Sequence, residues 1–539
     1  MDNKTIEKLI HNPKFLFIIP NLICGYKLFY HYNSNFGNRE VLFYEVILLF
    51  ILFIGINAVI YLFLNKALKD KHKVFIILSF IAMFYSVKFD LFSFLIFVAA
   101  ILLLIWDFKK FIHCKLDYGV TLISFIVIFL FGYNLLVAIY NVSYLTIKSK
   151  SYNYELDINV EEKTKTPNIY WIHCDGMLGF NTIKEYFSYP KKDLQNYLKD
   201  NQYIYNYDAR LVAGHSTQTA LAAMFNPYYY DNFFKVYLDE LEETYVNPKK
   251  KTSFIANYYE LVDKRLNNEL FKALEKKGYT TIAISDFNSH TSFNTDYFYD
   301  FYSFSRSSYN PIPDKKELRY MENEDNSKFS LFSYMQFNHF RSLLNTTVLY
   351  PLFENINYLN YETLDYENFD VSHYRNINQA DYWLMNATMK SLAHSSDIDK
   401  KFVFIDYKLN HLPLIYDAFG NKLDPNYNNN SKFYLGNYIY ASKLLIELLD
   451  FIRKMDEDAV VIIQGDHGIH MLEEETIMKQ LEITREQVQD IRNSVISAYY
   501  IPEKYQNGDE VYLNNPLNVS RYLINNFVGK NYEYIGNEK

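Results

Sequence analysis

The sequence predicts two parts of different fold class: an N-terminal α-helical bundle of about five transmembrane spans, followed by an α/β domain with a central, mostly parallel sheet. Long apolar runs are confined to residues 1–145. After residue 167, short apolar runs alternate with helical patterns instead. The charge changes as well: residues 1–150 hold 15 Lys and Arg against 8 Asp and Glu, a net +7, in a chain whose total charge is −8.

Five apolar runs are the predicted spans. The two strongest, Val41–Leu64 and Gly119–Tyr140, reach the roughly 20 residues that an α-helix needs to cross a bilayer. Two shorter runs, Lys73–Val87 and Leu91–Trp106, are separated by three residues and indicate a tight helical hairpin. The run Phe15–Tyr30 is weaker, because a proline, an asparagine and a lysine interrupt it.

The lysine-rich loops orient these spans, because such loops face the cytoplasm. They precede the first span and separate the second from the third and the fourth from the fifth. The N-terminus is therefore predicted to be cytoplasmic and the C-terminal domain extracytoplasmic, in a multi-pass protein of the cell membrane. If the first run does not span, only the N-terminus changes side. A cleaved signal peptide is the alternative for this run, but it lacks a small-residue cleavage site.

The predicted boundaries are residues 1–145 for the transmembrane domain, 146–166 for a polar linker and 167–539 for the extracytoplasmic domain. Since residues 1–150 carry +7 of a total of −8, residues 151–539 carry −15. Such an acidic domain argues against a nucleic-acid partner, which needs a basic surface.

Short apolar runs in the C-terminal domain are predicted to be buried strands, because apolar residues continue on both faces. These runs are Asn168–Cys174, Thr280–Ile284, Phe402–Asp406 and Ala459–Ile463. Helical patterns such as Asn267–Lys276 and Asn437–Lys454 lie between them, as in βαβ units. Ligands of open α/β sheets bind beyond the carboxyl ends of the strands. Polar residues at those ends are therefore the candidate site residues.

The first strand delivers Asp175, followed by Gly176. A carboxylate before a turn glycine suits a divalent cation. Taken alone, however, an Asp-Gly pair is more often an ordinary turn.

A stronger signal follows the last strand, where Asp466 and His467 lie between Gly465 and Gly468. A carboxylate and an imidazole on one tight turn can both reach a single metal ion, and the glycines allow close approach of the backbone. A purely structural turn is the weaker explanation for this segment.

A third segment places Ser216 and Thr217 where an apolar helical pattern begins. The N-terminus of a helix favours an anion such as a phosphoryl group, because its N–H groups are free and its dipole is positive there. A plain N-cap is the simpler explanation of the segment taken alone.

Together and in this order, the Asp-Gly pair, the hydroxyl at the helix start and the Gly-Asp-His-Gly turn resemble the sulfatase-like, alkaline phosphatase superfamily. The resemblance is greatest to its membrane phosphoethanolamine and phosphoglycerol transferases, including lipoteichoic acid synthases, which also pair five spans with an outward catalytic domain. It covers the five-span layout and residues 167–502, with specific motifs at only a few points. It implies a sulfatase-like catalytic fold.

The segment Thr-Gln-Thr-Ala that begins at Thr217 is similar to the Thr-x-Thr-Ala of phosphoethanolamine transferases. This similarity implies that Thr217 is the nucleophile, with Ser216 as the competing hydroxyl. It also implies that the metal ligands are Asp175, Thr217, Asp466 and His467, although those transferases usually carry Glu at the position of Asp175. The implied cofactor is a divalent metal ion, for which we expect zinc or manganese.

The segment Asn-His-Leu-Pro around His411 resembles the His-x-Pro segment of the family, whose histidine contacts substrate. His411 is therefore predicted to bind phosphoryl oxygens or to protonate the leaving group. Three residues are secondary candidates. His470 follows His467 by three residues, and His215 and Arg210 lie near Thr217 in sequence.

The resemblance implies transfer of phosphoglycerol or phosphoethanolamine from a phospholipid donor to a surface glycan or polymer through a phospho-threonine intermediate. A sulfatase-like hydrolase (phosphodiesterase, phosphatase or sulfuric ester hydrolase) using the same site is one alternative, and an inactive scaffold or sensor is another. Sulfatases of the formylglycine type require Cys or Ser in Cys/Ser-x-Pro-x-Arg. The segments at Cys174 and Ser216 do not fit that pattern, so sulfate-ester hydrolysis by that chemistry is not expected.

Overall fold

The computed structural model describes most of the α/β domain and several N-terminal helices. The described residues are 13–34, 43–68, 74–75, 77–79, 81–82, 116–150, 165–189, 192–214, 216–235, 238, 268–285, 295–300, 318–322, 362–364, 383–411, 414, 416–421, 423, 433–469 and 474–536.

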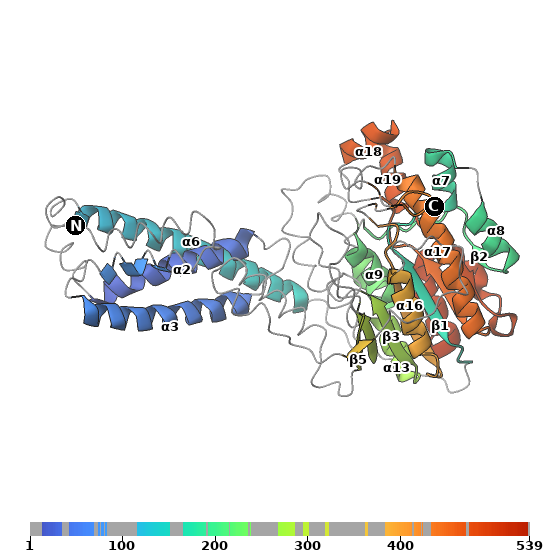
Figure 1. The fold of residues 1–539 in the computed structure, drawn as a ribbon, viewed down its shortest axis with the longest axis horizontal. Helices are drawn as coiled ribbons and strands as arrows, with labels where there is room; N and C mark the ends of the chain where they lie inside the picture. Colours follow the sequence, from blue (N-terminus) through green and yellow to red (C-terminus); the bar gives the residue numbers. More distant parts are fainter. Residues whose placement is uncertain are drawn as a thin grey trace. The chain divides into compact units, whose positions relative to one another are not determined.

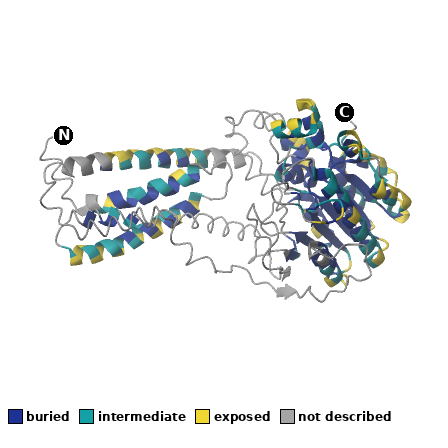
Figure 2. Cartoon of the chain, turned by 45° about the horizontal axis from the view of Figure 1, so that its top comes forward, coloured by how far each residue is buried: buried dark blue, intermediate teal, exposed yellow. Residues whose placement is uncertain are grey.

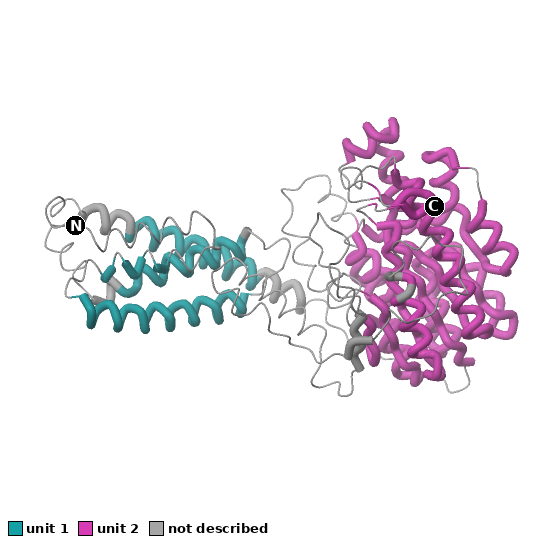
Figure 3. The backbone as a smooth tube through the Cα atoms, viewed as in Figure 1, with its two compact units in different colours: residues 1–153, 251–257, 332–359 teal, residues 154–250, 258–331, 360–539 magenta. Residues whose placement is uncertain are grey.

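The chain divides into two compact units (Figure 3). One unit contains the helices α2 (Pro13–Ser34), α3 (Phe43–Ala67) and α6 (Leu116–Lys150). Among the described residues, α3 and residues 124–143 of α6 are long and apolar enough to cross a membrane. The predicted span at 91–106 lies outside the described residues and the one at 73–87 lies only partly within them. Two of the five predicted spans are therefore supported, and the five-span bundle remains a prediction.

Buried and exposed residues alternate along the long helices (Figure 2). Their exposed residues include many apolar ones, and polar side chains make contacts between the helices. Asn57 of α3 donates to Asn21 of α2 at 2.8 Å, and Asn33 of α2 donates to the carbonyl of Asn134 in α6 at 2.9 Å. Such interhelical hydrogen bonds stabilise helix contacts in lipid. The exposed side chains include Leu48, Ile51, Val59, Leu62, Phe63, Phe125, Phe129 and Leu136. An exposed apolar surface of this kind is typical of a segment that contacts a membrane or another protein.

The other unit contains the sheet. Its described strands are β1 (Ile169–Cys174), β2 (Ile204–Tyr205), β3 (Thr280–Ser285), β4 (Tyr297–Asp300), β5 (Leu318–Glu322), β6 (Glu362–Leu364), β7 (Lys401–Tyr407), β8 (Val460–Gln464) and β9 (Ser497–Tyr500). Their order is β2-β9-β8-β1-β7-β3-β4-β5-β6. The central strands β8, β1, β7, β3 and β4 pair in parallel, whereas β9, β2, β5 and β6 join through antiparallel pairs.

The sheet is therefore mixed, and the prediction of a mostly parallel sheet holds only for its centre. All four strands predicted from sequence belong to this parallel centre, and their ends differ from the predicted ends by one residue or less. The antiparallel strands are only two to five residues long. Charged residues interrupt β5 and β6, and β2 and β9 have only two and four residues, so none of them shows the apolar run that revealed the central strands.

Helices cover both faces of the sheet (Figure 1). On one face, Tyr170 and Ile172 of β1 belong to the core that packs on α7 (Phe180–Phe187), α8 (Asp193–Asp200), α16 (Trp383–His394) and α17 (Tyr434–Met455). On the other face, rings of α9 (Thr217–Phe225) and α13 (Glu269–Lys276) cover the strands. The ring centroids of Trp171 and Phe225 are 4.9 Å apart, and those of Phe271 and Phe402 are also 4.9 Å apart. Burial on both faces explains why these strands are continuously apolar.

The described part of the chain contains further helices and helical turns. They are α10 (Pro227–Tyr229), α18 (Glu474–Leu481), α19 (Arg485–Asn493) and α20 (Val519–Leu523), with the π-helical turns η2 (Tyr230–Phe234) and η10 (Ile524–Val528) and the 3₁₀ turns η7 (Glu503–Tyr505), η8 (Asp509–Asn514) and η9 (Pro516–Asn518).

Candidate metal centre

The carboxyl ends of three neighbouring parallel strands carry the candidate site. Strand β1 lies between β8 and β7, and the register places His173 of β1 opposite Asp406 and Gln464. Asp175 follows β1 directly, Asp466 follows β8, and His411 lies in the loop after β7. These loops therefore start at one edge of the sheet, where open α/β folds bind their ligands.

Two glycines allow the loops to approach closely. Gly176 has φ +69°, a left-handed conformation that strains any residue with a side chain. At Gly468, a Cβ atom would lie 1.9 Å from the carbonyl oxygen of Ile491, so no other residue fits without moving the backbone. The predicted need for glycine beside the Asp-His pair thus has a physical cause.

Asp175, Asp466 and His467 form a buried cluster. Candidate ligand atoms of these residues all lie within 4.8 Å of one another. His467 Nε2 is 3.2 Å from Asp466 Oδ2 and 3.6 Å from Asp175 Oδ1. Neither of those carboxylate oxygens has a well-formed hydrogen bond in the described part of the chain. Buried carboxylate oxygens that lack well-formed hydrogen bonds are costly, so a divalent cation fits this set of ligand atoms, and zinc and manganese accept such ligands.

The Thr217 hydroxyl reaches the same cluster. Its Oγ1 atom lies 3.3 Å from His467 Nε2, and the residue is 7% exposed. Ser216 is the N-cap of α9, and its Oγ accepts from the Thr219 N–H at 3.4 Å and contacts Thr219 Oγ1 at 3.1 Å. The two neighbouring hydroxyls thus differ in position: Thr217 contacts the cluster, whereas Ser216 caps the helix.

His411 approaches from the loop after β7. Its Nε2 atom lies 3.8 Å from Asp175 Oδ1, and its ring centroid is 6.4 Å from that of His467. The loop is fastened to the Asp-Gly turn, because Asn410 donates to the carbonyl of Gly176 at 3.1 Å. Tyr434 of α17 donates to the same carbonyl at 2.8 Å. The backbone around His411 is therefore held beside Asp175.

Sequence reasoning missed a buried pair behind this cluster. His173 Nδ1 lies 3.1 Å from Asp406 Oδ1, and His173 Nε2 lies 3.5 Å from Asp466 Oδ2. The other Asp406 oxygen accepts from Ser285 Oγ and pairs with Lys408 Nζ, each at 2.9 Å. The available signal was a histidine and an aspartate within otherwise apolar strands. His173 thus connects the candidate ligand Asp466 to a second carboxylate.

Burial and charge act in opposite directions on these groups. Burial would lower the pKa of His173, but the charges of Asp466 and Asp406 outweigh burial and raise the pKa to about 10. Burial would raise the pKa of Asp466, but the charges of His467 and His173 outweigh burial and lower it. The Asp466 carboxylate is therefore held in its anionic form, which is the form that binds a metal.

Of these three secondary candidates, the structure describes Arg210, whose contacts lie outside this cluster. Arg210 pairs with Asp490 and Asp208, each at 2.8 Å, and donates to Thr182 at 3.2 Å. Its guanidinium group therefore joins α19 to α7. His215 and His470 lie outside the described residues.

Fold and site together define an α/β protein with a buried candidate metal centre and an adjacent threonine hydroxyl. No protein-family model matches the sequence, and a search of curated proteins finds no match.

A comparison with solved structures finds several matches at low identity. The periplasmic domain of EptC from Escherichia coli, in complex with Zn, is 10% identical with a TM-score of 0.33, covering 70% of this chain and 87% of that one. The same domain of the phosphoethanolamine transferase EptC from Campylobacter jejuni is 12% identical with a TM-score of 0.34, covering 69% and 92%. The lipoteichoic acid synthase LtaP from Listeria monocytogenes is 14% identical with a TM-score of 0.32, covering 73% and 79%.

These neighbours carry the names of the enzyme families that the sequence motifs resemble. Identities of 10–14% and TM-scores of 0.32–0.34 are too low to assign an activity. The function is therefore inferred from the geometry of the site.

Proposed function

We propose that this protein is a membrane-anchored, metal-dependent transferase. It moves a phospho-head-group, phosphoglycerol or phosphoethanolamine, from a phospholipid to a glycan or polymer of the cell envelope. The observation that carries this proposal is the meeting of a helix-terminal hydroxyl with an acidic, histidine-containing cluster: Thr217 Oγ1 lies 3.3 Å from His467 Nε2. A hydroxyl beside a candidate metal centre is the arrangement required of a metal-activated nucleophile.

Four residues are proposed to hold the metal: Asp175, Asp466, His467 and the Thr217 hydroxyl. Zinc is the first choice and manganese the second, because both take oxygen and nitrogen donors. The EptC domain from E. coli is itself a zinc complex. When bound, the ion supplies positive charge that lowers the pKa of the hydroxyl and stabilises charge on phosphoryl oxygens.

The phospho-head-group is proposed to move in two transfers, first to Thr217 and then to the acceptor. Thr217 Oγ1 loses its proton to solvent and bonds to phosphorus, while the bond from phosphorus to the lipid oxygen breaks. His411 gives a proton to that oxygen, and diacylglycerol leaves. A hydroxyl of the acceptor next attacks the phosphorus of the phospho-threonine and gives its proton to His411, while the bond from phosphorus to Thr217 Oγ1 breaks. Solvent then returns a proton to Thr217 Oγ1.

The surroundings fit an anionic reactant. The first N–H groups of α9 follow Ser216, and this end of a helix favours negative charge. The apolar surfaces of α3 and α6 are proposed to anchor the chain in the membrane that holds the lipid donor. Residues 167–539 are proposed to form the extracytoplasmic catalytic domain, where surface glycans are available as acceptors.

Mass spectrometry of the Thr217 peptide tests this proposal. Purified full-length protein would be incubated with zinc and vesicles of phosphatidylglycerol or of phosphatidylethanolamine. The mass added to Thr217 is expected to equal phosphoglycerol or phosphoethanolamine. Discharge to water alone, even with envelope glycan supplied, would make the protein a hydrolase. Absence of any adduct and of any released diacylglycerol would favour the scaffold or sensor alternative.

A further inference from the structure

Helix α17 begins beside the two loops that supply Asp175 and His411. Its first residue, Tyr434, and Asn437, one turn later, lie on the same side of the helix. Both side chains are buried, and each residue is 1% exposed. The reaction proposed above does not use either residue. Their polar atoms nevertheless lie where they can fix the positions of both site residues.

The Tyr434 hydroxyl joins the two loops to each other. It donates to the carbonyl of Gly176 at 2.8 Å and accepts from the Leu178 N–H at 3.0 Å, both in the segment that follows β1. It also accepts from the side-chain amide of Asn410, in the loop after β7. Gly176 directly follows a candidate metal ligand, and Asn410 directly precedes the proposed proton donor. One hydroxyl thus fixes the position of the first relative to the second.

The Asn437 side chain holds only the loop after β7. Its amide donates to the Leu409 carbonyl at 2.6 Å and to Asn410 Oδ1 at 3.4 Å. Its Oδ1 atom accepts from the Tyr416 N–H at 3.2 Å. These contacts lie on both sides of His411 in sequence. Asn437 therefore orients the loop of the proposed proton donor by contacts that are separate from the metal-ligand turn.

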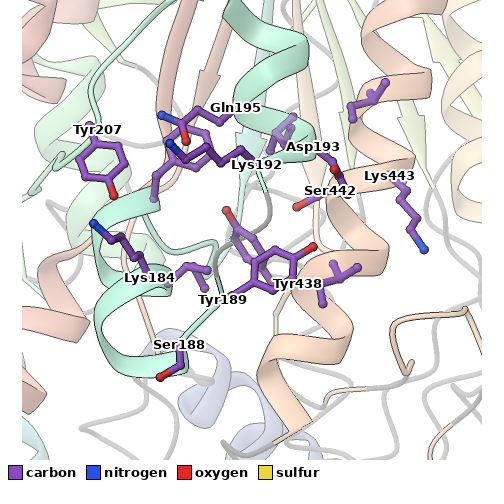
Figure 4. A pocket seen from close by; sticks show the side chains of 15 residues that line it. Lys184, Ser188, Tyr189, Lys192, Asp193, Gln195, Tyr207, Tyr438, Ser442 and Lys443 are labelled. Carbon is purple, nitrogen blue, oxygen red and sulfur yellow. The ribbon is translucent and has the colours of Figure 1, made fainter.

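The next tyrosine of the helix shows a different pattern of contacts. Tyr438 is 3% exposed and lines a cavity formed by residues of α7, α8 and α17 (Figure 4). In the described part of the chain, no hydrogen bond joins its hydroxyl to either loop. The Tyr434 ring packs in the same core, with its centroid 6.2 Å from that of Tyr438. The ring of Tyr434 thus fills the core and its hydroxyl holds the loops, so removal of the oxygen alone separates the two roles.

We propose that Tyr434 and Asn437 are positioning residues with separable effects. The Tyr434 hydroxyl places Asp175 for metal binding and His411 for proton transfer, whereas Asn437 places His411 alone. Each residue acts through the backbone that it holds. The effect on metal affinity is independent of the reaction, and the effect on proton transfer rests on the proposed function.

Two variants of the full-length protein in detergent separate these effects. Tyr434→Phe should weaken zinc binding about tenfold, as loss of a partner behind a ligand typically does. Asn437→Ala should leave zinc affinity unchanged, because the contacts that it loses lie in the other loop. Competition with a chromophoric chelator measures both affinities without any activity assay.

Labelling of Thr217 from vesicles of phosphatidylglycerol or phosphatidylethanolamine is measured at saturating zinc. Both variants should label about 10–100-fold more slowly than the wild-type protein, because a small displacement of a reacting group has an effect of this size. Tyr438→Phe removes a buried hydroxyl one turn along the same helix and is the matched control. It should change neither zinc affinity nor labelling. Thermal unfolding checks that each variant is folded at the assay temperature.

Hydrogen–deuterium exchange tests the contacts without zinc or donor. Peptides that contain Leu178 should exchange faster in Tyr434→Phe, and peptides that contain Tyr416 should exchange faster in Asn437→Ala. In each variant the N–H group loses the acceptor that protects it.

Other outcomes overturn the proposal. Unchanged zinc affinity in Tyr434→Phe, or unchanged exchange at Leu178, would remove the role assigned to the hydroxyl. Equal losses of zinc affinity in Tyr434→Phe and Asn437→Ala would mean that the site loosens as a whole. Normal labelling in both variants would show that His411 does not need these contacts. Absence of labelling in the wild-type protein would instead reject the proposed function, while zinc affinity and exchange still decide the positioning role.

Discussion

Thr217 and His467 stand 250 positions apart in the chain, yet the Oγ1 atom of one lies 3.3 Å from the Nε2 atom of the other. Thr217 begins α9, which covers one face of the sheet, and His467 follows β8. A helix start and a strand end thus meet at the carboxyl edge. The proximity of these two atoms makes separate tests of metal binding and of nucleophilic attack worthwhile.

Removal of either ligand on the turn after β8 is expected to remove the metal. Asp466→Asn and His467→Ala should each reduce bound zinc to a small fraction of the wild-type content, because each deletes a donor from the proposed set. Zinc per protein is measured by mass spectrometry after dialysis, with circular dichroism as the control for folding. Full zinc occupancy in both variants would refute this metal site.

The hydroxyls of Thr217 and Ser216 are expected to have different roles, one as the nucleophile and the other as a helix cap. Thr217→Ala should abolish covalent labelling from a phospholipid donor, because the attacking oxygen is gone. Ser216→Ala should keep labelling and lower the free energy of unfolding by about 0.5–2 kcal/mol, since only an N-cap is lost. Labelling that survives in Thr217→Ala but disappears in Ser216→Ala would instead assign the nucleophile to Ser216.

His173 is expected to position Asp466. His173→Gln should weaken zinc binding about 10–100-fold, as loss of a partner behind a ligand typically does. Competition with a chromophoric chelator measures this affinity without any activity assay. The matched control is Ser497→Ala, which removes a buried polar group of β9 outside the cluster. Unchanged zinc affinity in His173→Gln would limit His173 to a packing role.

Glu447 is expected to make stability depend on pH. Burial and then the charge of Asp450 raise its pKa from 4.5 to about 7. Between pH 4.5 and 7, Glu447 therefore stays protonated in the folded state but loses its proton in the unfolded state. The free energy of unfolding accordingly falls as the pH rises through this window. Glu447→Gln should raise the free energy of unfolding at pH 8 by roughly 1–2 kcal/mol, allowing for partial exposure, and have little effect near pH 4.5.

Thermal unfolding at the two pH values, followed by fluorescence, measures this difference. Glu503→Gln replaces an exposed glutamate and serves as the control. An equal effect of Glu447→Gln at both pH values would contradict the assigned cause.

The last prediction concerns the orientation of the predicted spans in the membrane. A reporter enzyme fused after residue 150 should be active only outside the cytoplasm, because the lysine-rich loops orient the predicted spans. Alkaline phosphatase and green fluorescent protein fusions at the same position make a matched pair, since the first is active outside and the second fluoresces inside. Fluorescence without phosphatase activity would reverse the orientation.

The parts of the fold and site that the sequence predicted share a simple local pattern. Strands β1, β3, β7 and β8 are apolar on both faces, and Asp175, Asp466 and His467 closely follow such runs. The role of His173 depends instead on which strands are neighbours. Its contacts with Asp406 and Asp466 require β1 to lie between β7 and β8, and a run of apolar residues contains no information on strand order.

Helix α17 carries a residue of the candidate site and part of the sheet core on one continuous backbone. Tyr434, in its first turn, holds the carbonyl beside Asp175, and later turns place Leu444, Leu445, Leu448 and Leu449 in the core against the sheet. Because successive residues of a helix are fixed about 1.5 Å apart along its axis, α17 acts as a rigid rod between the two places. Any sliding of α17 along its axis would move the Gly176 anchor and the packed leucines by the same amount.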